Sequence, residues 1–258
     1  MNVAARPGAA GVSAVEWQLR CDLAALYRLM AHFRMTDFIY THISARVPGP
    51  EHHFLINRYG VLFHEMRASD LVKIDLEGRC VDERPESEVN RAGFVIHSAI
   101  HAARPDLACV IHTHTAAGIA VSAQEGGLLA LSQHAARFFG RLAYHDYEGI
   151  ALDTGERERL VADLGANRAM ILRNHGLLAC GRSIPEAFLE IYFLERACQA
   201  QVAAQSGGAA LRPMPDAVAR RVAEQFAAGS EQGAEAHAAM AWASALRLVE
   251  NDRPDYRS

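Results

Sequence analysis

The sequence predicts one α/β domain in which helices cover both faces of a β-sheet. Two observations favour this class: short runs of strand-forming residues alternate with segments of helical periodicity, and half of the 258 residues are apolar. A chain of this length can bury a full core. We expect a mobile arm over residues 1–12, the main domain over 13–206 and a helical extension over 207–258.

The N-terminal third is predicted to be a helix followed by a β-rich segment. Ser13 and Glu16 match a capping box, and apolar residues then recur at helical spacing to Phe33. Short β-like runs separated by Pro- and Gly-containing turns occupy residues 38–81.

The remaining elements alternate along the chain. Helices are expected over residues 90–103, 116–122, 153–164 and in a short piece at 133–134. Ser183 and Glu186 match a second capping box at the start of a long helix. An Ala-rich helical segment from Asp216 is predicted to be broken at Gly229 and Gly233. Strands are expected over residues 108–113, 128–131, 142–144, 168–173 and 177–180.

Charge and cysteine content exclude several function classes. Lys and Arg number 26 against 30 Asp and Glu, which gives no electrostatic footprint for nucleic acid or an anionic membrane. The five cysteines are widely spaced and include no Cys-x-x-Cys, a pattern typical of reduced thiols. We therefore expect a cytoplasmic protein with no nucleic-acid or membrane partner.

Three histidines form the strongest candidate site. His112 and His114 close a strand-like run, and residues i and i+2 of a strand point to one face. The turn Asn174-His175-Gly176, after a second such run, could bring a third imidazole to the same end of the sheet. Three histidines with an open position are typical of a catalytic metal site. The alternative is that these are half-buried polar residues at strand ends.

Four segments carry a family resemblance. They read "INRYGVLFHEMRASDLVKID", "NRAGFVIHSAIHAARPDLACVIHTHT", "YHDYEGI" and "ILRNHGLLACGRSIPEAF". In collinear order they resemble the class II aldolase and adducin superfamily, in particular the adducin head domain and its bacterial relatives, over roughly residues 15–205. The resemblance implies a three-layer α/β/α sandwich around a central, mainly antiparallel sheet. It also implies a homotetramer with active sites between subunits.

The resemblance also implies a metal. In the sugar-phosphate aldolases and epimerases of this superfamily, the positions of His112, His114 and His175 bind a catalytic divalent ion. Zinc is the first expectation, with manganese, cobalt and iron as alternatives.

The chain departs from the aldolase pattern at the substrate positions. The acid/base glutamate of fuculose-phosphate aldolase falls on Gly93, and the paired serines fall on Arg91 and Ala92. The phosphate-cradling loop resembles residues 41–44, Thr-His-Ile-Ser. These departures favour a small, unphosphorylated substrate.

The function expected is that of a metal-dependent carbon–carbon lyase, an aldolase or decarboxylase, acting on a small oxo or hydroxy acid. Decarboxylation tolerates the loss of a base at Gly93 better than aldol cleavage does. The alternatives are an iron(II)-dependent oxygenase acting on an aromatic oxo acid and a non-catalytic, adducin-like binding or assembly protein.

The remaining candidates are a proton donor and substrate-binding residues. His134 is the first candidate for the donor, because it falls near the position of a tyrosine acid in fuculose-phosphate aldolase; Tyr144 and Glu148 follow. Arg91 could pair with a substrate carboxylate, and His97 is predicted on the helix facing the site. Each has a simpler interpretation: a surface histidine for His134, a solvated arginine for Arg91 and a core imidazole for His97.

Overall fold

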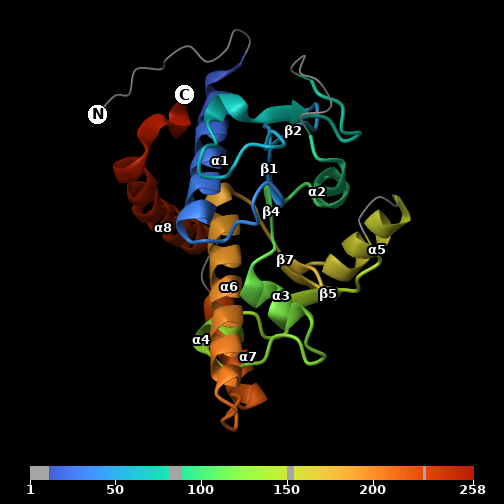
Figure 1. The fold of residues 1–258 in the computed structure, drawn as a ribbon, viewed down its shortest axis with the longest axis vertical. Helices are drawn as coiled ribbons and strands as arrows, with labels where there is room; N and C mark the ends of the chain where they lie inside the picture. Colours follow the sequence, from blue (N-terminus) through green and yellow to red (C-terminus); the bar gives the residue numbers. More distant parts are fainter. Residues whose placement is uncertain (1–11, 82–88, 150–153, 229–230) are drawn as a thin grey trace.

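A computed structural model of the chain describes residues 12–81, 89–149, 154–228 and 231–258 (Figure 1). The predicted N-terminal arm, apart from Val12, lies outside these residues. The strands are β1 (His42–Arg46), β2 (Phe54–Ile56), β3 (Val72–Ile74), β4 (Cys109–Thr113), β5 (Leu142–His145), β6 (Ala169–Leu172) and β7 (Gly176–Gly181). The α-helices are α1 (Ala14–His32), α2 (Arg91–Ala103), α3 (Ala116–Ser122), α4 (Gln133–Ala136), α5 (Thr154–Leu164), α6 (Ile184–Ser206), α7 (Asp216–Ala227) and α8 (Glu231–Asp252). Two 3-10 turns, η1 (Ala68–Asp70) and η3 (Pro254–Arg257), complete the described elements.

The strands form one seven-stranded sheet in the order β3-β2-β1-β4-β7-β6-β5. Every neighbouring pair is antiparallel except β5 and β6, which are parallel. The expectation of a central, mainly antiparallel sheet with helices on both faces is therefore confirmed. Strand β4 lies between β1 and β7, so residues near its end have neighbours from both sides.

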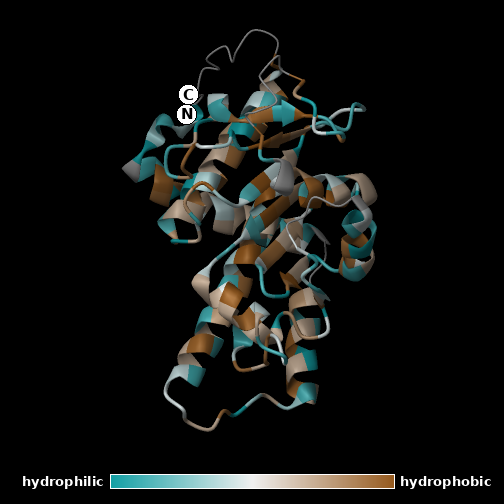
Figure 2. Ribbon diagram, turned by 45° about the vertical axis from the view of Figure 1, so that its right-hand side comes forward, coloured by the Kyte–Doolittle hydropathy of each residue, from teal (hydrophilic) through white to brown (hydrophobic). Residues whose placement is uncertain are grey.

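Alternating side chains of the strands build a separate core on each face of the sheet. On one face, Ile43, Ile111 and Leu177 pack with α1, α6 and α8. On the other, Val110 and Leu178 pack with α2 and α5. Figure 2 shows the hydrophobic residues concentrated on the strands and on inward helix faces. His112 shares the face of Val110, because the two are separated by two positions on β4.

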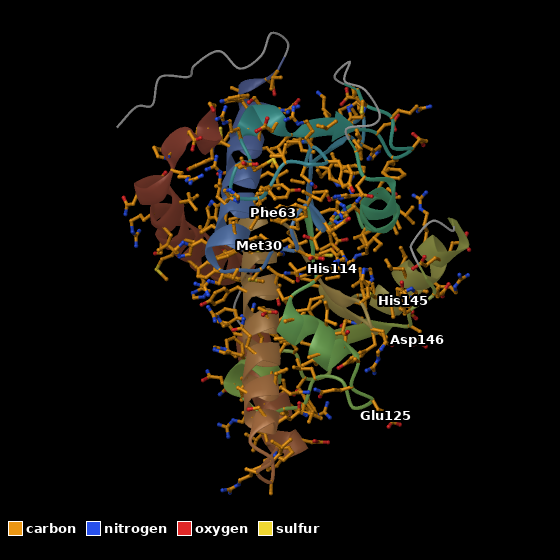
Figure 3. All side chains as sticks on the ribbon, in the orientation of Figure 1. Met30, Phe63, His114, Glu125, His145 and Asp146 are labelled. Atoms are coloured by element: carbon orange, nitrogen blue, oxygen red, sulfur yellow. The ribbon has the colours of Figure 1, made fainter. Side chains whose placement is uncertain are left out.

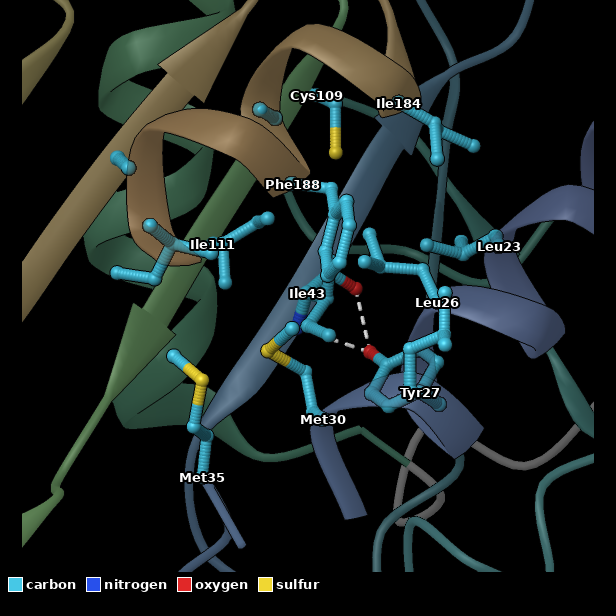
Figure 4. Packing of buried hydrophobic residues seen from close by; sticks show 14 of the residues in the cluster. Leu23, Leu26, Tyr27, Met30, Met35, Ile43, Cys109, Ile111, Ile184 and Phe188 are labelled. Atoms are coloured by element: carbon cyan, nitrogen blue, oxygen red, sulfur yellow. Dashed lines mark hydrogen bonds between the residues drawn. The ribbon is translucent and has the colours of Figure 1, made fainter. Parts of the chain in front are cut away.

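Of the two hydrogen bonds of the capping box predicted at the start of helix α1, one is present. The Ser13 hydroxyl accepts a hydrogen bond from the Glu16 backbone N–H at 3.1 Å. The Glu16 carboxylate binds Arg20 and Lys73 instead of returning to the cap. The helix is then joined to the sheet by Tyr27, whose buried hydroxyl contacts the backbone N–H and carbonyl of Ile43 (Figure 4).

Two sequence-based expectations are wrong. Residues 128–131 do not form a strand, because the Leu128 N–H donates to the Tyr144 hydroxyl and the Leu129 N–H to the Gln201 side chain. These side-chain acceptors replace the ladder that a strand would need. Gly233 does not break the C-terminal segment but lies within α8, which packs on α1 and α6.

The five cysteines are all free, as expected. Among the described helices, none has the length and apolar character needed to cross a membrane.

Candidate metal centre

Strand β4 and the turn before β7 bring three imidazoles together. His112 lies in β4 and His114 lies just beyond its end, where Figure 3 labels it. The Nε2 atoms of His112 and His114 are 2.8 Å apart, and those of His114 and His175 are 2.9 Å apart. One nitrogen from each ring lies within 4.8 Å of the other two. The structure thus brings together the three histidines singled out in the sequence.

In the Asn174-His175-Gly176 turn, the residues on either side of His175 suit the local backbone geometry. Asn174 has a φ of 55°, a left-handed conformation that asparagine tolerates better than most residues. Gly176 begins β7 so close to β4 that a Cβ would lie 2.3 Å from the carbonyl oxygen of Thr113. Only glycine allows this approach, and the approach places His175 beside His114.

In two of the rings, those of His112 and His114, the nitrogen that points away from the other histidines donates a hydrogen bond. His112 Nδ1 donates to the carbonyl of Leu177 at 3.0 Å, and His114 Nδ1 donates to a carboxylate oxygen of Asp37 at 2.9 Å. Since neither oxygen can donate, Nδ1 carries the proton in the neutral form of each ring. Both Nε2 atoms therefore present lone pairs to the same point.

This arrangement fits a divalent ion. Two lone pairs 2.8 Å apart repel each other unless a cation lies between them. For comparison, two nitrogen ligands of one tetrahedral zinc lie about 3.3 Å apart. The contacts to Leu177 and Asp37 are the outer partners that usually orient metal-binding histidines.

Burial keeps the rings of His112 and His175 neutral. Desolvation, followed by the neighbouring His175 and His114, holds the pKa of His112 well below its usual range. Desolvation, followed by His114, lowers the pKa of His175 to about 4. Near neutral pH both rings are unprotonated, which is the form that binds a metal.

A second group of histidines lies beside the first, on the face covered by α2. The Ser44 hydroxyl contacts His97 Nδ1 at 2.6 Å and His101 Nε2 at 2.7 Å. His97, predicted to bind substrate, is wholly buried, and its partner there is the Ser44 hydroxyl. His42, on the same strand as Ser44, is also buried, and desolvation followed by His114 and His175 lowers its pKa to about 4.

No described contact joins any of the three candidate proton donors to the three histidines. The Tyr144 hydroxyl accepts from the Leu128 N–H, and Arg173 lies over its ring. Glu148 pairs with Arg159, which lowers its pKa. His134 is exposed on α4 and lies against Phe193 of α6. Their catalytic roles stay predictions.

Arg91 begins α2, but its side chain lies outside the described part of the structure. Its role as a carboxylate-binding residue also stays a prediction.

Sequence reasoning missed Asp37 as a site residue and placed His42 only within the segment that resembles the family's phosphate-cradling loop, without a role of its own. Both come from the segment between α1 and the middle of β1, which approaches the three histidines only because β1 pairs with β4. The sequence contains one signal: the polar residues Asp37, Thr41 and His42 lie close together near the start of the predicted strand.

Comparison with known proteins gives consistent results. The family described as Class II Aldolase and Adducin N-terminal domain matches residues 21–202. A crystal structure of an aldolase II superfamily protein from Pseudomonas syringae is 56% identical, with a TM-score of 0.89 over 96% of this chain and 98% of that chain. An L-fuculose 1-phosphate aldolase from Glaciozyma antarctica is 30% identical, with a TM-score of 0.81 over 98% of this chain and 97% of that chain. Alpha-adducin of Rattus norvegicus is 48% identical over 74% of this chain but only 26% of its own length.

Proposed function

Because the chain belongs to the class II aldolase and adducin family, we propose that it is a divalent-metal-dependent carbon–carbon lyase. Its substrate is a small, unphosphorylated oxo or hydroxy acid. The observation that carries this proposal is the convergence of three imidazole nitrogens with two Nδ1 atoms fixed by Leu177 and Asp37.

His112, His114 and His175 would hold the ion, with zinc as the first choice. A divalent ion held by three neutral imidazoles supplies positive charge that polarises a substrate carbonyl and stabilises the enolate left by carbon–carbon cleavage. Asp37 and the Leu177 carbonyl keep two of the rings in the required tautomer. The Tyr147 ring, 5.8 Å from that of His175 and half exposed, forms an aromatic wall on one side of the site.

Position 93 supports decarboxylation over aldol cleavage. Residue 93 is glycine, so this chain has no carboxylate at that position, and a side chain there would overlap the His42 ring. Loss of carbon dioxide requires no base to begin, whereas aldol cleavage requires removal of a hydroxyl proton. The homotetramer with sites between subunits, and the cytoplasmic location, belong to the same proposal.

The test is product formation by the metal-loaded protein. Protein loaded separately with zinc, manganese or cobalt is incubated with a panel of 2-oxo acids that carry either a second carboxylate on carbon 3 or a hydroxyl group on carbon 4, so that cleavage leaves an enolate, and products are followed by NMR. We expect carbon dioxide or an aldehyde from at least one acid, and none from His112→Ala or after chelation. Oxygen uptake with iron(II), without cleavage with zinc, would select the oxygenase instead.

The similarity to alpha-adducin favours one further candidate, a non-catalytic binding or assembly protein. Such a protein would hold no metal and would tolerate His175→Ala with a small change in stability. Absence of turnover with every metal, together with a fully folded His175→Ala variant, would select this function.

A further inference from the structure

His42 lies beside the candidate metal centre, in the segment that resembles the family's phosphate-cradling loop, and has no role of its own in the site described above. It is the first residue of β1 and lies opposite His112 in the antiparallel ladder between β1 and β4. Directly opposed residues point to the same face, so both side chains lie on the side covered by α2. His42 is 6% exposed, and burial, followed by the neighbouring His114 and His175, lowers its pKa to about 4.

The ring of His42 fills the space of a missing side chain. A Cβ built on Gly93 of α2 would lie 2.2 Å from His42 Nδ1 and 2.3 Å from its Cε1. Since real Cβ atoms do not approach ring atoms so closely, any residue other than glycine would displace the ring. The His42 ring can therefore occupy this space only because residue 93 has no side chain.

The two ring nitrogens of His42 are buried, and neither has a hydrogen-bond partner among the described residues. His97 and His101, on the same face, each have one nitrogen without a partner among the described residues, but the other nitrogen of each ring contacts the Ser44 hydroxyl. The preceding Thr41 adds to the contrast: its buried hydroxyl also has no partner in the described part of the chain, and its φ is 69°. A β-branched residue rarely takes that conformation unless its surroundings impose it.

Buried polar atoms without partners are costly and point to a missing ligand. We propose that His42 contacts the substrate: its imidazole hydrogen-bonds an oxygen of the carboxylic acid held at His112, His114 and His175, and Gly93 makes room for it. A neutral imidazole offers one N–H donor, which suits a carboxylate oxygen. This inference rests on the proposed function, and it assigns a specificity-determining residue to that site.

The first experiment uses oxalate, a small dicarboxylate, as the probe. Zinc-loaded wild type, His42→Phe and the control His64→Phe are titrated with oxalate by calorimetry, and zinc content is measured in each. Phenylalanine keeps a ring of similar size without nitrogens, and His64 is an exposed histidine away from the sheet. We expect oxalate to bind His42→Phe about 10- to 100-fold more weakly, the range for one hydrogen bond to a charged group. Zinc content should be unchanged, and the control should match wild type.

Two outcomes would overturn the inference alone: equal oxalate affinity in His42→Phe and wild type, or loss of zinc from a folded His42→Phe, which would make His42 a ligand. A wild type that takes up no zinc would overturn the proposed function as well.

The second experiment needs no metal. It tests whether a side chain at position 93 and the His42 ring compete for the same space, and it can be done even if His42→Phe folds poorly. Gly93→Ala is compared in the wild-type background and in the His42→Ala background by urea unfolding. We expect Gly93→Ala to lower the unfolding midpoint in the first background and to leave it unchanged or higher in the second. An equal loss in both backgrounds would show that the two positions do not compete for the same space, contrary to the inference.

Discussion

Asp37 is the residue on which the orientation of His114 depends. Its carboxylate accepts from Nδ1 and thereby leaves Nε2 free to face the other two rings. His112 achieves the same through a backbone carbonyl, which no substitution of a side chain can remove. Of these two contacts, only that of Asp37 can therefore be removed by substituting a side chain.

We predict that Asp37→Asn weakens metal binding about 10- to 100-fold, the usual effect of losing an outer partner. The amide can still accept a hydrogen bond but carries no charge to raise the basicity of the ring. Competition with a chelating dye gives the affinity, and Asp146→Asn serves as the control because Asp146 is an exposed carboxylate after β5 (Figure 3). Equal affinities for Asp37→Asn and the control would show that the contact does not orient a ligand.

At the scale of elements, the site depends on how closely β4 and β7 approach. Gly176 sets that distance at one end of the strand pair, and Gly181 pairs with Cys109 at the other. On the opposite side of β4, Tyr27 of α1 fixes the start of β1 through Ile43. The neighbouring strands, rather than β4 itself, therefore determine which groups surround the histidines.

Gly176→Ala should destabilise the protein by about 2 kcal/mol or more, because the new methyl group overlaps a backbone carbonyl that cannot rotate away. It should also reduce the amount of bound metal by displacing His175. Urea unfolding and metal analysis measure the two effects. Gly207→Ala is the matched control, since nothing lies within 4 Å of a Cβ at Gly207. An unfolding free energy equal to that of the control would contradict the close approach.

Tyr27→Phe should cost about 1–3 kcal/mol, because it leaves the buried N–H groups of Ile43 and Asn57 without their acceptor. Thermal and urea unfolding would measure the loss. Tyr59→Phe provides the comparison, as Tyr59 is an exposed loop residue and its replacement should change stability by less than about 0.5 kcal/mol. Similar values for the two variants would mean that the Tyr27 hydroxyl does not hold α1 to the sheet.

At the scale of the whole molecule, the sequence predicted most elements and the three histidines, because both follow from local spacing. The two-residue period of β4 and the Asn-His-Gly turn are readable without knowing the sheet order. Asp37 could not be assigned to the site, and His42 was placed only in a segment that resembles the family's phosphate-cradling loop, since the position of both beside the histidines requires β1 to lie next to β4. The strand expected at residues 128–131 failed for a related reason: side chains of Tyr144 and Gln201, distant in sequence, take its hydrogen bonds.

Buried histidines should make the metal-free protein acid-sensitive. Desolvation, followed by Arg46, lowers the pKa of His101 to about 3, and desolvation also holds that of His97 well below its usual range. The unfolded chain, with a histidine pKa of about 6.5, binds more protons than the folded chain below that pH. Stability is therefore complete above about pH 6.5 and falls as the pH drops towards the folded pKa.

Each such histidine contributes a slope of about 1.4 kcal/mol per pH unit in that window. Urea unfolding with a chelator present, from about pH 7 to about pH 5, measures the total slope. His101→Gln should reduce it, whereas His237→Gln, a change at an exposed histidine on α8, should not. A stability that stays flat over this range would show that the buried rings are not neutral in the folded protein.

We propose above that His112, His114 and His175 together hold one divalent ion. Elemental analysis of purified wild type beside His112→Ala and His175→Ala tests it most directly, with circular dichroism to verify folding. We expect about one zinc, manganese, cobalt or iron per chain in the wild type and loss of that metal in both folded variants. A wild type without metal even after reconstitution, or folded variants that keep it, would contradict the claim.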